Sequence, residues 1–183
     1  MKQAHSSYNK NQNNYIKSQK YTKINYTMTR TIYNLLQELF RLSLQDSELY
    51  QKRQELGQKI LDNLCKTTKI METSLLVEDV PQEYLLTNGE ITHKLLGYYT
   101  SKIIIQNNLG NPLNPCIVIA NKTPKKLIPI SHNMFLLTLI HEWTHHYDYA
   151  KLHLIKSVHS KGFYGRMFSI SQPMFDYIQT FLQ

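Results

Sequence analysis

Residues 139–148 read Leu-Ile-His-Glu-Trp-Thr-His-His-Tyr-Asp, and this stretch decides how the rest of the chain is interpreted. Within it, His141, Glu142 and His145 form the pattern H-E-x-x-H. On a helix, this pattern places two histidines on one face for a zinc ion and a glutamate beside them as a general base. The pattern arises by chance in roughly 2% of chains of this composition, so its surroundings have to support it.

The surroundings of the motif predict a long helix. No Gly or Pro interrupts the chain from Met134 to Lys161, and Ser131 or Asn133 can cap the first turn after Pro129. Apolar residues recur at helical spacing and are expected to face the core. These residues are Leu136, Leu139, Ile140, Trp143, Tyr147 and Ala150.

The helical geometry brings the motif residues to one metal ion. His141 and His145 lie about 40° apart in projection and about 6 Å apart along the axis, so both imidazoles can reach it. Glu142 is turned by about 100° from His141, which places it beside the metal-bound water rather than on the metal. Asp148 falls on the same side as the two histidines, opposite the apolar stripe.

A catalytic zinc takes three protein ligands and a water, so one more ligand is needed. The candidates are His146, Asp148, His153 and His159. His146 and His153 project away from the metal face of the helix. Asp148 fits better as an acceptor for an imidazole N–H, with a role as substitute ligand left open. His159 lies beyond the expected helix end, before the turn-forming residues Ser160 to Gly162, and is the favoured third ligand.

The rest of the chain predicts a single α+β domain. Helical periodicity indicates two packed helices, or one bent helix, over about residues 29–66. Ser74 to Val77, Leu95 to Gln106 and Pro115 to Ala120 have the composition of strands, with turn residues between them, and predict a small sheet. Ser171 to Gln183 predicts a last amphipathic helix.

Positive charge is concentrated at the N-terminus. The chain has 183 residues and a formal net charge of +8, and its first 37 residues hold six bases and no acid. Residues 1–27 are polar and predict a basic, flexible arm, whereas residues 28–183 form the domain. Tyrosines among the lysines of the arm could stack on bases while the lysines follow phosphates, so the arm is a candidate for contact with DNA.

Several classes of protein are excluded. No apolar run is long enough for a membrane span, and the first 20 residues contain no apolar stretch typical of a secretion signal, so we expect a cytoplasmic protein with no membrane partner. The two cysteines, Cys65 and Cys116, have no zinc spacing and are expected to be buried as small apolar residues.

A second block supports the motif. His159-Ser160-Lys161-Gly162-Phe163 follows His145 after thirteen intervening residues. With H-E-x-x-H, this block resembles the SprT-like zinc metalloproteases, which include the Spartan proteases. The resemblance implies a zincin-like fold with N-terminal helices, a small mixed sheet and an active-site helix. It also implies His159 as the third zinc ligand and Phe163 as a packing aromatic. Ser160 stands where that family usually has Gly.

The pattern therefore predicts a zinc-dependent metalloprotease. Zn²⁺ held by His141, His145 and His159 would activate a water, and Glu142 would take its proton and pass it to the leaving amine. Tyr164, His146 and Tyr149 remain candidates for stabilising the oxyanion, whereas Tyr147 lies on the core stripe. A peptide substrate would add as a strand along a sheet edge formed by residues 117–121.

Two other functions are consistent with the sequence. The chain could be a catalytically inactive zinc-site protein that serves as a nucleic-acid or protein binding module. It could also be a metalloprotease effector with one dedicated target. If it is a general protease, its basic arm would direct it to proteins associated with nucleic acid, with repair of DNA–protein crosslinks as one such process.

Overall fold

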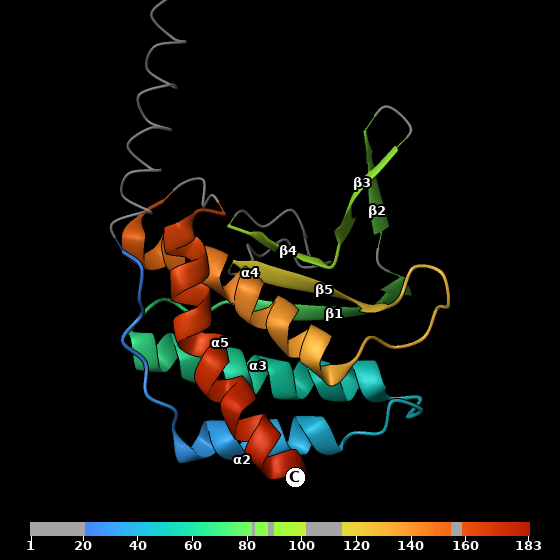
Figure 1. The fold of residues 1–183 in the computed structure, drawn as a ribbon, viewed down its shortest axis with the longest axis horizontal. Helices are drawn as coiled ribbons and strands as arrows, with labels where there is room; N and C mark the ends of the chain where they lie inside the picture. The colour runs from blue at the N-terminus through green and yellow to red at the C-terminus, as the bar shows by residue number, and fades with distance from the viewer. Residues whose placement is uncertain (1–20, 82, 88–89, 102–114, 155–158) are drawn as a thin grey trace, which may run out of the picture.

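The computed structural model describes residues 21–81, 83–87, 90–101, 115–154 and 159–183. Its helices are α2 (Arg30–Arg41), α3 (Leu49–Thr68), α4 (His132–Leu152) and α5 (Lys161–Leu182). Its strands are β1 (Ser74–Pro81), β2 (Glu83–Thr87), β3 (Glu90–Leu95), β4 (Gly97–Thr100) and β5 (Cys116–Lys122). The fold is α+β, as the sequence predicts (Figure 1).

The central sheet has three strands in the order β1-β5-β4. Strand β5 pairs in parallel with β1, in a register that joins Leu76 to Val118, and antiparallel with β4, where Tyr99 lies opposite Ile117. β5 is therefore the middle strand. The prediction that residues 117–121 form a sheet edge for a peptide is wrong, because β4, which precedes β5 in the chain, pairs along one side of it and β1 along the other.

A separate hairpin of β2 and β3 projects beyond the sheet (Figure 1). It was not predicted, because residues 83–95 lack the alternation of apolar and polar residues that indicates a half-buried strand. The predicted strand from Leu95 to Gln106 is observed as β4, over Gly97–Thr100. Residues 102–106 of that prediction lie outside the described residues.

The helices pack around the sheet in a way that fixes α4 beside β4. Helix α3 contacts β1, while α4 contacts β4 and β5, and α5 contacts both α4 and α2 (Figure 1). The predicted pair of N-terminal helices is confirmed as α2 and α3. A single core joins all of these elements and includes the apolar residues of the motif helix, such as Leu136, Leu139 and Trp143, which are fully buried.

The boundaries of the last two helices differ from the prediction. Helix α4 ends at Leu152, and His153 adopts a left-handed conformation with φ 55°. Helix α5 begins at Lys161, because the side chain of Ser160 accepts a hydrogen bond from the backbone N–H of Phe163 and caps it. Residues 160–162, predicted as a turn, therefore start a helix that is much longer than the predicted one from Ser171.

The packed region begins before residue 28. Ile24 is 3% exposed, and its backbone N–H donates to the hydroxyl of Ser169 on α5. Residues 21–27, which the sequence assigns to the flexible arm, are thus anchored along α5. Residues 1–20, which carry most of the arm's lysines and the predicted contact with DNA, lie outside the described residues.

Two further sequence predictions have structural outcomes. Cys65 and Cys116 are both buried, as predicted, and burial raises the pKa of the Cys65 thiol to about 11. None of the helices in the described residues combines the length and the apolar composition that crossing a bilayer requires.

Candidate metal centre

Three histidines converge near the middle of α4. His141 and His145 project from α4, and His159 approaches them from the residues just before α5. The Nε2 atom of His159 lies 3.0 Å from Nε2 of His141 and 2.9 Å from Nε2 of His145. One ligand atom from each of the three residues lies within 4.8 Å of the other two, an arrangement that could hold a metal ion.

A buried aromatic ring supports the three imidazoles. Phe163 is fully buried on the first turn of α5. Its ring centroid lies 5.1 Å from that of His141, 4.5 Å from that of His145 and 4.9 Å from that of His159. Because Phe163 also donates its backbone N–H to the Ser160 cap, the ring position and the start of α5 are fixed together.

Helices α4 and α5 are joined by a buried ion pair. The Asp148 carboxylate accepts two hydrogen bonds of 2.7 Å from the Arg166 guanidinium, and neither side chain is exposed. Arg166 also donates to the backbone carbonyl of Tyr21, which anchors the N-terminal segment at the same point. Arg166 thus contacts both carboxylate oxygens of Asp148. That Asp148 also accepts an imidazole N–H stays a prediction.

The other two candidate histidines lie outside the cluster. His146 is fully buried and bonds elsewhere, with its Nδ1 3.2 Å from the Tyr99 hydroxyl and its Nε2 2.8 Å from the Met71 carbonyl. His153 caps the C-terminus of α4 and is exposed. His159 is therefore the candidate that the fold brings to His141 and His145.

Burial sets the protonation of the cluster. It lowers the pKa of His141 to about 4, with a further contribution from His159, and the pKa of His145 to about 3, with contributions from both neighbours. Burial also lowers the pKa of His159. All three imidazoles are thus neutral near pH 7, which is the form that binds a metal. Three neutral imidazole nitrogens are a donor set that suits Zn²⁺, so these residues fit that ion.

Glu142 lies next to the histidine cluster, in a buried environment that raises the pKa of its carboxyl group. It is 7% exposed, and its Oε1 is 4.0 Å from Nε2 of His141. Burial raises the pKa of Glu142 to about 7, against a smaller opposing effect of a hydrogen bond from the Tyr99 backbone N–H. A carboxylate with such a pKa can both accept and return a proton near neutral pH.

The structure distinguishes among the residues that were predicted to stabilise the oxyanion. His146 is excluded, because both of its ring nitrogens are engaged away from the metal cluster. Tyr147 packs on Trp143, as predicted. Tyr164 is 40% exposed and its ring lies 6.0 Å from that of His159, whereas the ring of Tyr149 contacts Tyr99 at 6.3 Å. Tyr164 is thus the candidate that contacts a ring of the metal cluster.

Sequence reasoning missed two residues that shape the site. Tyr99 contacts Glu142 through its backbone, and Arg166 engages Asp148 from another helix. Arg166 could not be identified from the sequence. Its partner Asp148 lies eighteen residues earlier on another helix, and no local pattern links the two positions. Tyr99 belongs to a predicted strand, but the pattern of one strand does not show which helix residue it meets.

No protein-family model, no curated protein and no solved structure matches this chain.

Proposed function

We propose that this protein is a zinc-dependent peptidase in which His141, His145 and His159 hold the metal and Glu142 is the general base. The observation that carries the proposal is the convergence of three neutral imidazoles, with ligand atoms within 4.8 Å of one another, beside a buried carboxylate. A cluster of three histidines is the ligand set of several hydrolytic zinc sites, and it leaves a fourth position for water.

Zn²⁺, when bound, would lower the pKa of a coordinated water and polarise the scissile carbonyl. Glu142 would act as the general base that takes a proton from the attacking water and returns it to the leaving amine. Its burial excludes bulk water, and its position one residue after His141 keeps it at the edge of the cluster without making it part of the ligand set. Tyr164 supplies a hydroxyl for the developing oxyanion from the first turn of α5.

The resemblance to the SprT-like metalloproteases supports the same proposal. The chain carries the H-E-x-x-H helix and, across the start of the next helix, the block from His159 to Phe163. Phe163 packs against all three imidazoles, which is the role that the resemblance implies for it. The zincin-like fold and membership of this family are part of the proposal.

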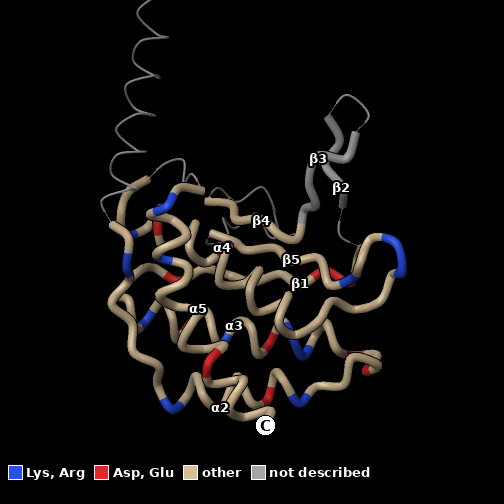
Figure 2. Tube along the Cα trace, in the orientation of Figure 1, with Lys and Arg blue, Asp and Glu red and all other residues tan. Residues whose placement is uncertain are grey.

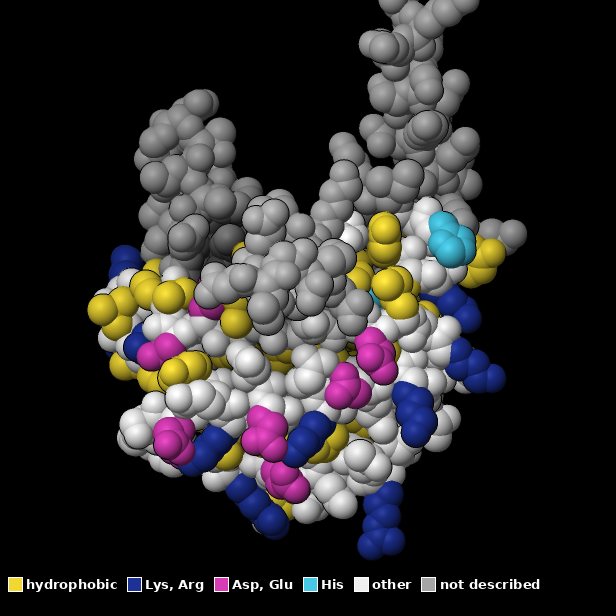
Figure 3. Space-filling view, turned by 180° about the vertical axis from the view of Figure 1, so that it is seen from behind, with side chains coloured by type: hydrophobic (Ala, Val, Ile, Leu, Met, Phe, Trp, Pro, Cys, Tyr) yellow, Lys and Arg dark blue, Asp and Glu magenta, His cyan; other side chains and the backbone are white. Residues whose placement is uncertain are grey.

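The proposal commits to peptide hydrolysis and assigns no nucleic-acid surface to the described residues. Lys and Arg positions alternate with Asp and Glu positions along α3 and the loops near it (Figure 2). Over the left and centre of the face shown in Figure 3, basic and acidic side chains are also interspersed. A mixed surface of this kind lacks the single-sign field that attracts a phosphate backbone. Contact with DNA remains a prediction for residues 1–20.

The test combines metal analysis with hydrolysis of an unstructured protein such as casein. Purified protein should contain zinc and cleave the substrate, and Glu142→Gln should retain zinc while its rate falls by about a hundredfold or more. A wild-type protein that binds zinc but shows no hydrolysis dependent on Glu142 would contradict the proposal. That result would instead favour the binding module that the sequence left open.

A further inference from the structure

The outward face of α5 changes in character along the helix. In the second half of α5, the exposed positions Gln172 and Gln179 are polar, as expected for a face in contact with solvent. In the first half, the same face carries Phe168 and Tyr164, which are 54% and 40% exposed. The aromatic positions of this face are therefore the ones at the end of α5 that begins beside the metal cluster.

The two exposed rings form a continuous path from a candidate metal ligand. The ring of Tyr164 lies 6.0 Å from that of His159, and the ring of Phe168 lies 6.5 Å from that of Tyr164. Single exposed aromatic residues are common on protein surfaces and need no explanation. Two rings that contact each other and continue to the metal cluster form an apolar surface within reach of a molecule bound at the metal.

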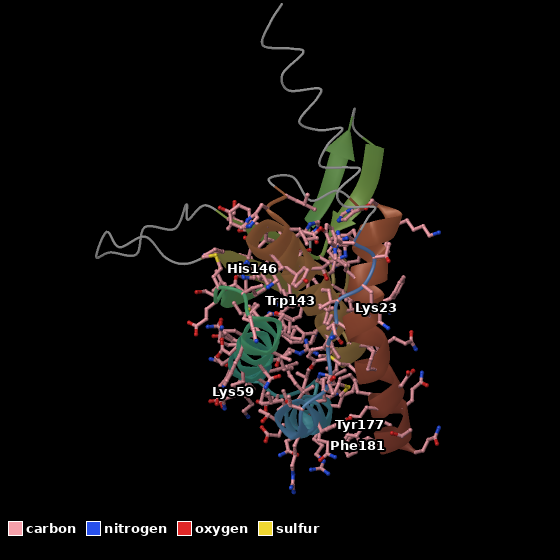
Figure 4. All side chains as sticks on the ribbon, turned by 90° about the vertical axis from the view of Figure 1, so that its left-hand side faces the viewer. Lys23, Lys59, Trp143, His146, Tyr177 and Phe181 are labelled. Atoms are coloured by element: carbon pink, nitrogen blue, oxygen red, sulfur yellow. The ribbon has the colours of Figure 1, made fainter. Side chains whose placement is uncertain are left out.

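Aromatic residues in the second half of α5 have structural partners. The ring of Tyr177 lies 4.5 Å from that of Tyr33 on α2. The guanidinium of Arg41, at the end of α2, lies over the ring of Phe181 at 5.2 Å from its centroid. In Figure 4, both residues of α5 lie beside α2. Packing between helices thus accounts for these two rings, whereas the exposure of Phe168 leaves its ring accessible to a ligand.

The spacing along this face suits an extended peptide. Tyr164 and Phe168 are four residues apart, which corresponds to about 6 Å along a helix axis. In an extended chain, side chains on the same side are two residues apart, which corresponds to about 6.6–6.8 Å. A peptide whose scissile carbonyl lies at the metal, next to Tyr164, would therefore place a side chain about two residues away against Phe168.

The exposed charges on the two helices beside the metal cluster have one sign. Among the described residues of α4 and the first four turns of α5, the acids are Glu142 and Asp148, and both are buried. The exposed Lys side chains there are Lys151 and Lys161. Lys161 lies about one turn before Tyr164, on the same face of α5. This end of the face therefore attracts an acidic side chain and repels a basic one.

We propose that Phe168 is a specificity-determining residue of the peptidase: its ring, which continues from that of Tyr164, binds a bulky apolar side chain about two residues from the scissile bond. Lys161, on the other side of Tyr164, favours an acidic residue across that bond. The inference rests on the proposed function and names its substrate class, an extended peptide with both features. The competing explanation is that Phe168 is an exposed residue without a ligand.

The first test profiles the bonds that are cleaved. Wild-type protein is incubated with a library of random dodecapeptides, and the products are identified by mass spectrometry. Bulky apolar residues should be enriched about two residues from the cut, and acidic residues on its other side. Phe168→Ala should lose the apolar enrichment and keep the acidic one. No apolar enrichment in wild type, or the same enrichment in Phe168→Ala, would overturn the inference.

The matched control for this profile is Leu182→Ala. Leu182 is also an exposed apolar residue of α5, at 61%, but it is the last residue of the helix, at the opposite end from the metal cluster. The variant should keep both enrichments. Loss of the apolar enrichment in Leu182→Ala as well as in Phe168→Ala would contradict a specific role for Phe168.

The second test measures rates on two synthetic peptides. One is the peptide of the library that wild type cleaves best, and the other carries Ser in place of its enriched apolar residue. Phe168→Ala should lower kcat/KM for the first peptide by roughly tenfold and leave kcat/KM for the second unchanged. The zinc content of the variant should equal that of wild type. A loss by the same factor for both peptides would overturn the inference, because it indicates a structural defect.

Charge reversal tests the role of Lys161. Lys161→Glu should change the enrichment from acidic to basic residues and leave the apolar enrichment unchanged. Lys59→Glu is the matched control, because Lys59 is an exposed residue of α3 that lies across the molecule from α5 in Figure 4. Its profile should equal that of wild type. An unchanged profile in Lys161→Glu would overturn the acidic preference.

A binding measurement separates this inference from the proposed function. If wild type cleaves none of the library, the peptidase function fails, and the same dodecapeptides are instead captured on the immobilised full-length protein loaded with zinc. Captured peptides that are enriched in bulky apolar residues with wild type, and not with Phe168→Ala, would support the face as a peptide-binding surface. Equal capture by the two proteins would overturn the inference on its own.

Discussion

The carboxylate of Asp148 and the guanidinium of Arg166 form a doubly hydrogen-bonded ion pair in which neither side chain is exposed to solvent. Asp148 lies one turn after His145 on α4, and Arg166 lies on α5, which begins shortly after His159. The pair therefore joins the helix that carries His141 and His145 to the helix that follows His159. A buried pair of this kind is costly to break, because the remaining partner stays buried without its counter-charge.

Removing one partner should destabilise the fold. Arg166→Leu is expected to lower the free energy of unfolding by about 3–5 kcal/mol, measured by urea denaturation of the metal-free protein. The matched control is Lys122→Met, which breaks the exposed pair between Lys122 and Asp79 and should cost under about 1 kcal/mol. Equal losses in the two variants would show that the buried pair does not hold α4 and α5 together.

The pH dependence of the metal-free protein should report the buried Glu142. Its folded pKa of about 7 lies above the ordinary value of 4.5, so the folded state binds more protons than the unfolded state between these values. Stability should therefore fall as pH rises from 4.5 to about 7, by about 3 kcal/mol from this group.

The difference between wild type and Glu142→Gln isolates this effect. His141 and His145 have lowered pKa values and therefore act in the opposite direction, costing stability as pH falls below about 6.5. Their contribution is common to both proteins. A difference in the free energy of unfolding that stays constant from pH 4.5 to 7 would contradict the assigned environment of Glu142.

Gly97 should be required for the approach of β4 to β5. A Cβ at this position would lie 2.6 Å from the Val118 backbone carbonyl, which cannot move without disturbing the sheet. Gly97→Ala should therefore lower the melting temperature and slow hydrolysis by displacing Tyr99. Gly57→Ala is the comparison: its Cβ would meet the flexible end of Leu75, and alanine favours the helix, so the loss should be smaller. A larger fall in melting temperature for Gly57→Ala than for Gly97→Ala would contradict the close approach of β4 to β5.

The basic arm can be tested by truncation after residue 20. This position spares Ile24 and the other anchored residues, which a cut at the predicted boundary would remove. The truncated protein should keep its zinc and its hydrolytic rate. If the arm contacts DNA, its four lysines should account for up to roughly 3–4 in the slope of log affinity against log salt, and the truncation should remove that slope. Identical affinity and slope in both proteins would eliminate the arm as a DNA contact.

Local patterns predicted the parts of the site that lie on one element. Helical spacing was enough to bring His141 and His145 to one point and to turn Glu142 beside them, because a helix has a fixed geometry. The apolar stripe predicted which face of α4 packs into the core, and Trp143 is fully buried there. His159 was predicted because it lies beyond the expected helix end, before turn-forming residues, and because the family resemblance implies it. In the structure its ring lies against those of His141 and His145.

Features that depend on distant contacts were not predicted. A helical projection shows which side of α4 carries Asp148. It does not show that α5 packs against that side and supplies Arg166. The order of the strands depends on pairing between segments that are distant in the sequence. The prediction that β5 is an edge strand was therefore wrong, because β1 and β4 flank it. Helix α4 ends at Leu152, and the left-handed residue that comes next is His153. Because this residue is not glycine, the usual sequence signal for a helix end was missing.

The central claim is that His141, His145 and His159 together hold one zinc ion, and elemental analysis of the purified protein tests it most directly. Wild type should contain one zinc per chain after dialysis, and His159→Asn should lose it. His153→Asn is the matched control, because it makes the same substitution at an exposed histidine outside the cluster, and it should retain one zinc. A wild-type protein without stoichiometric zinc, or a His159→Asn variant that keeps it, would contradict the account.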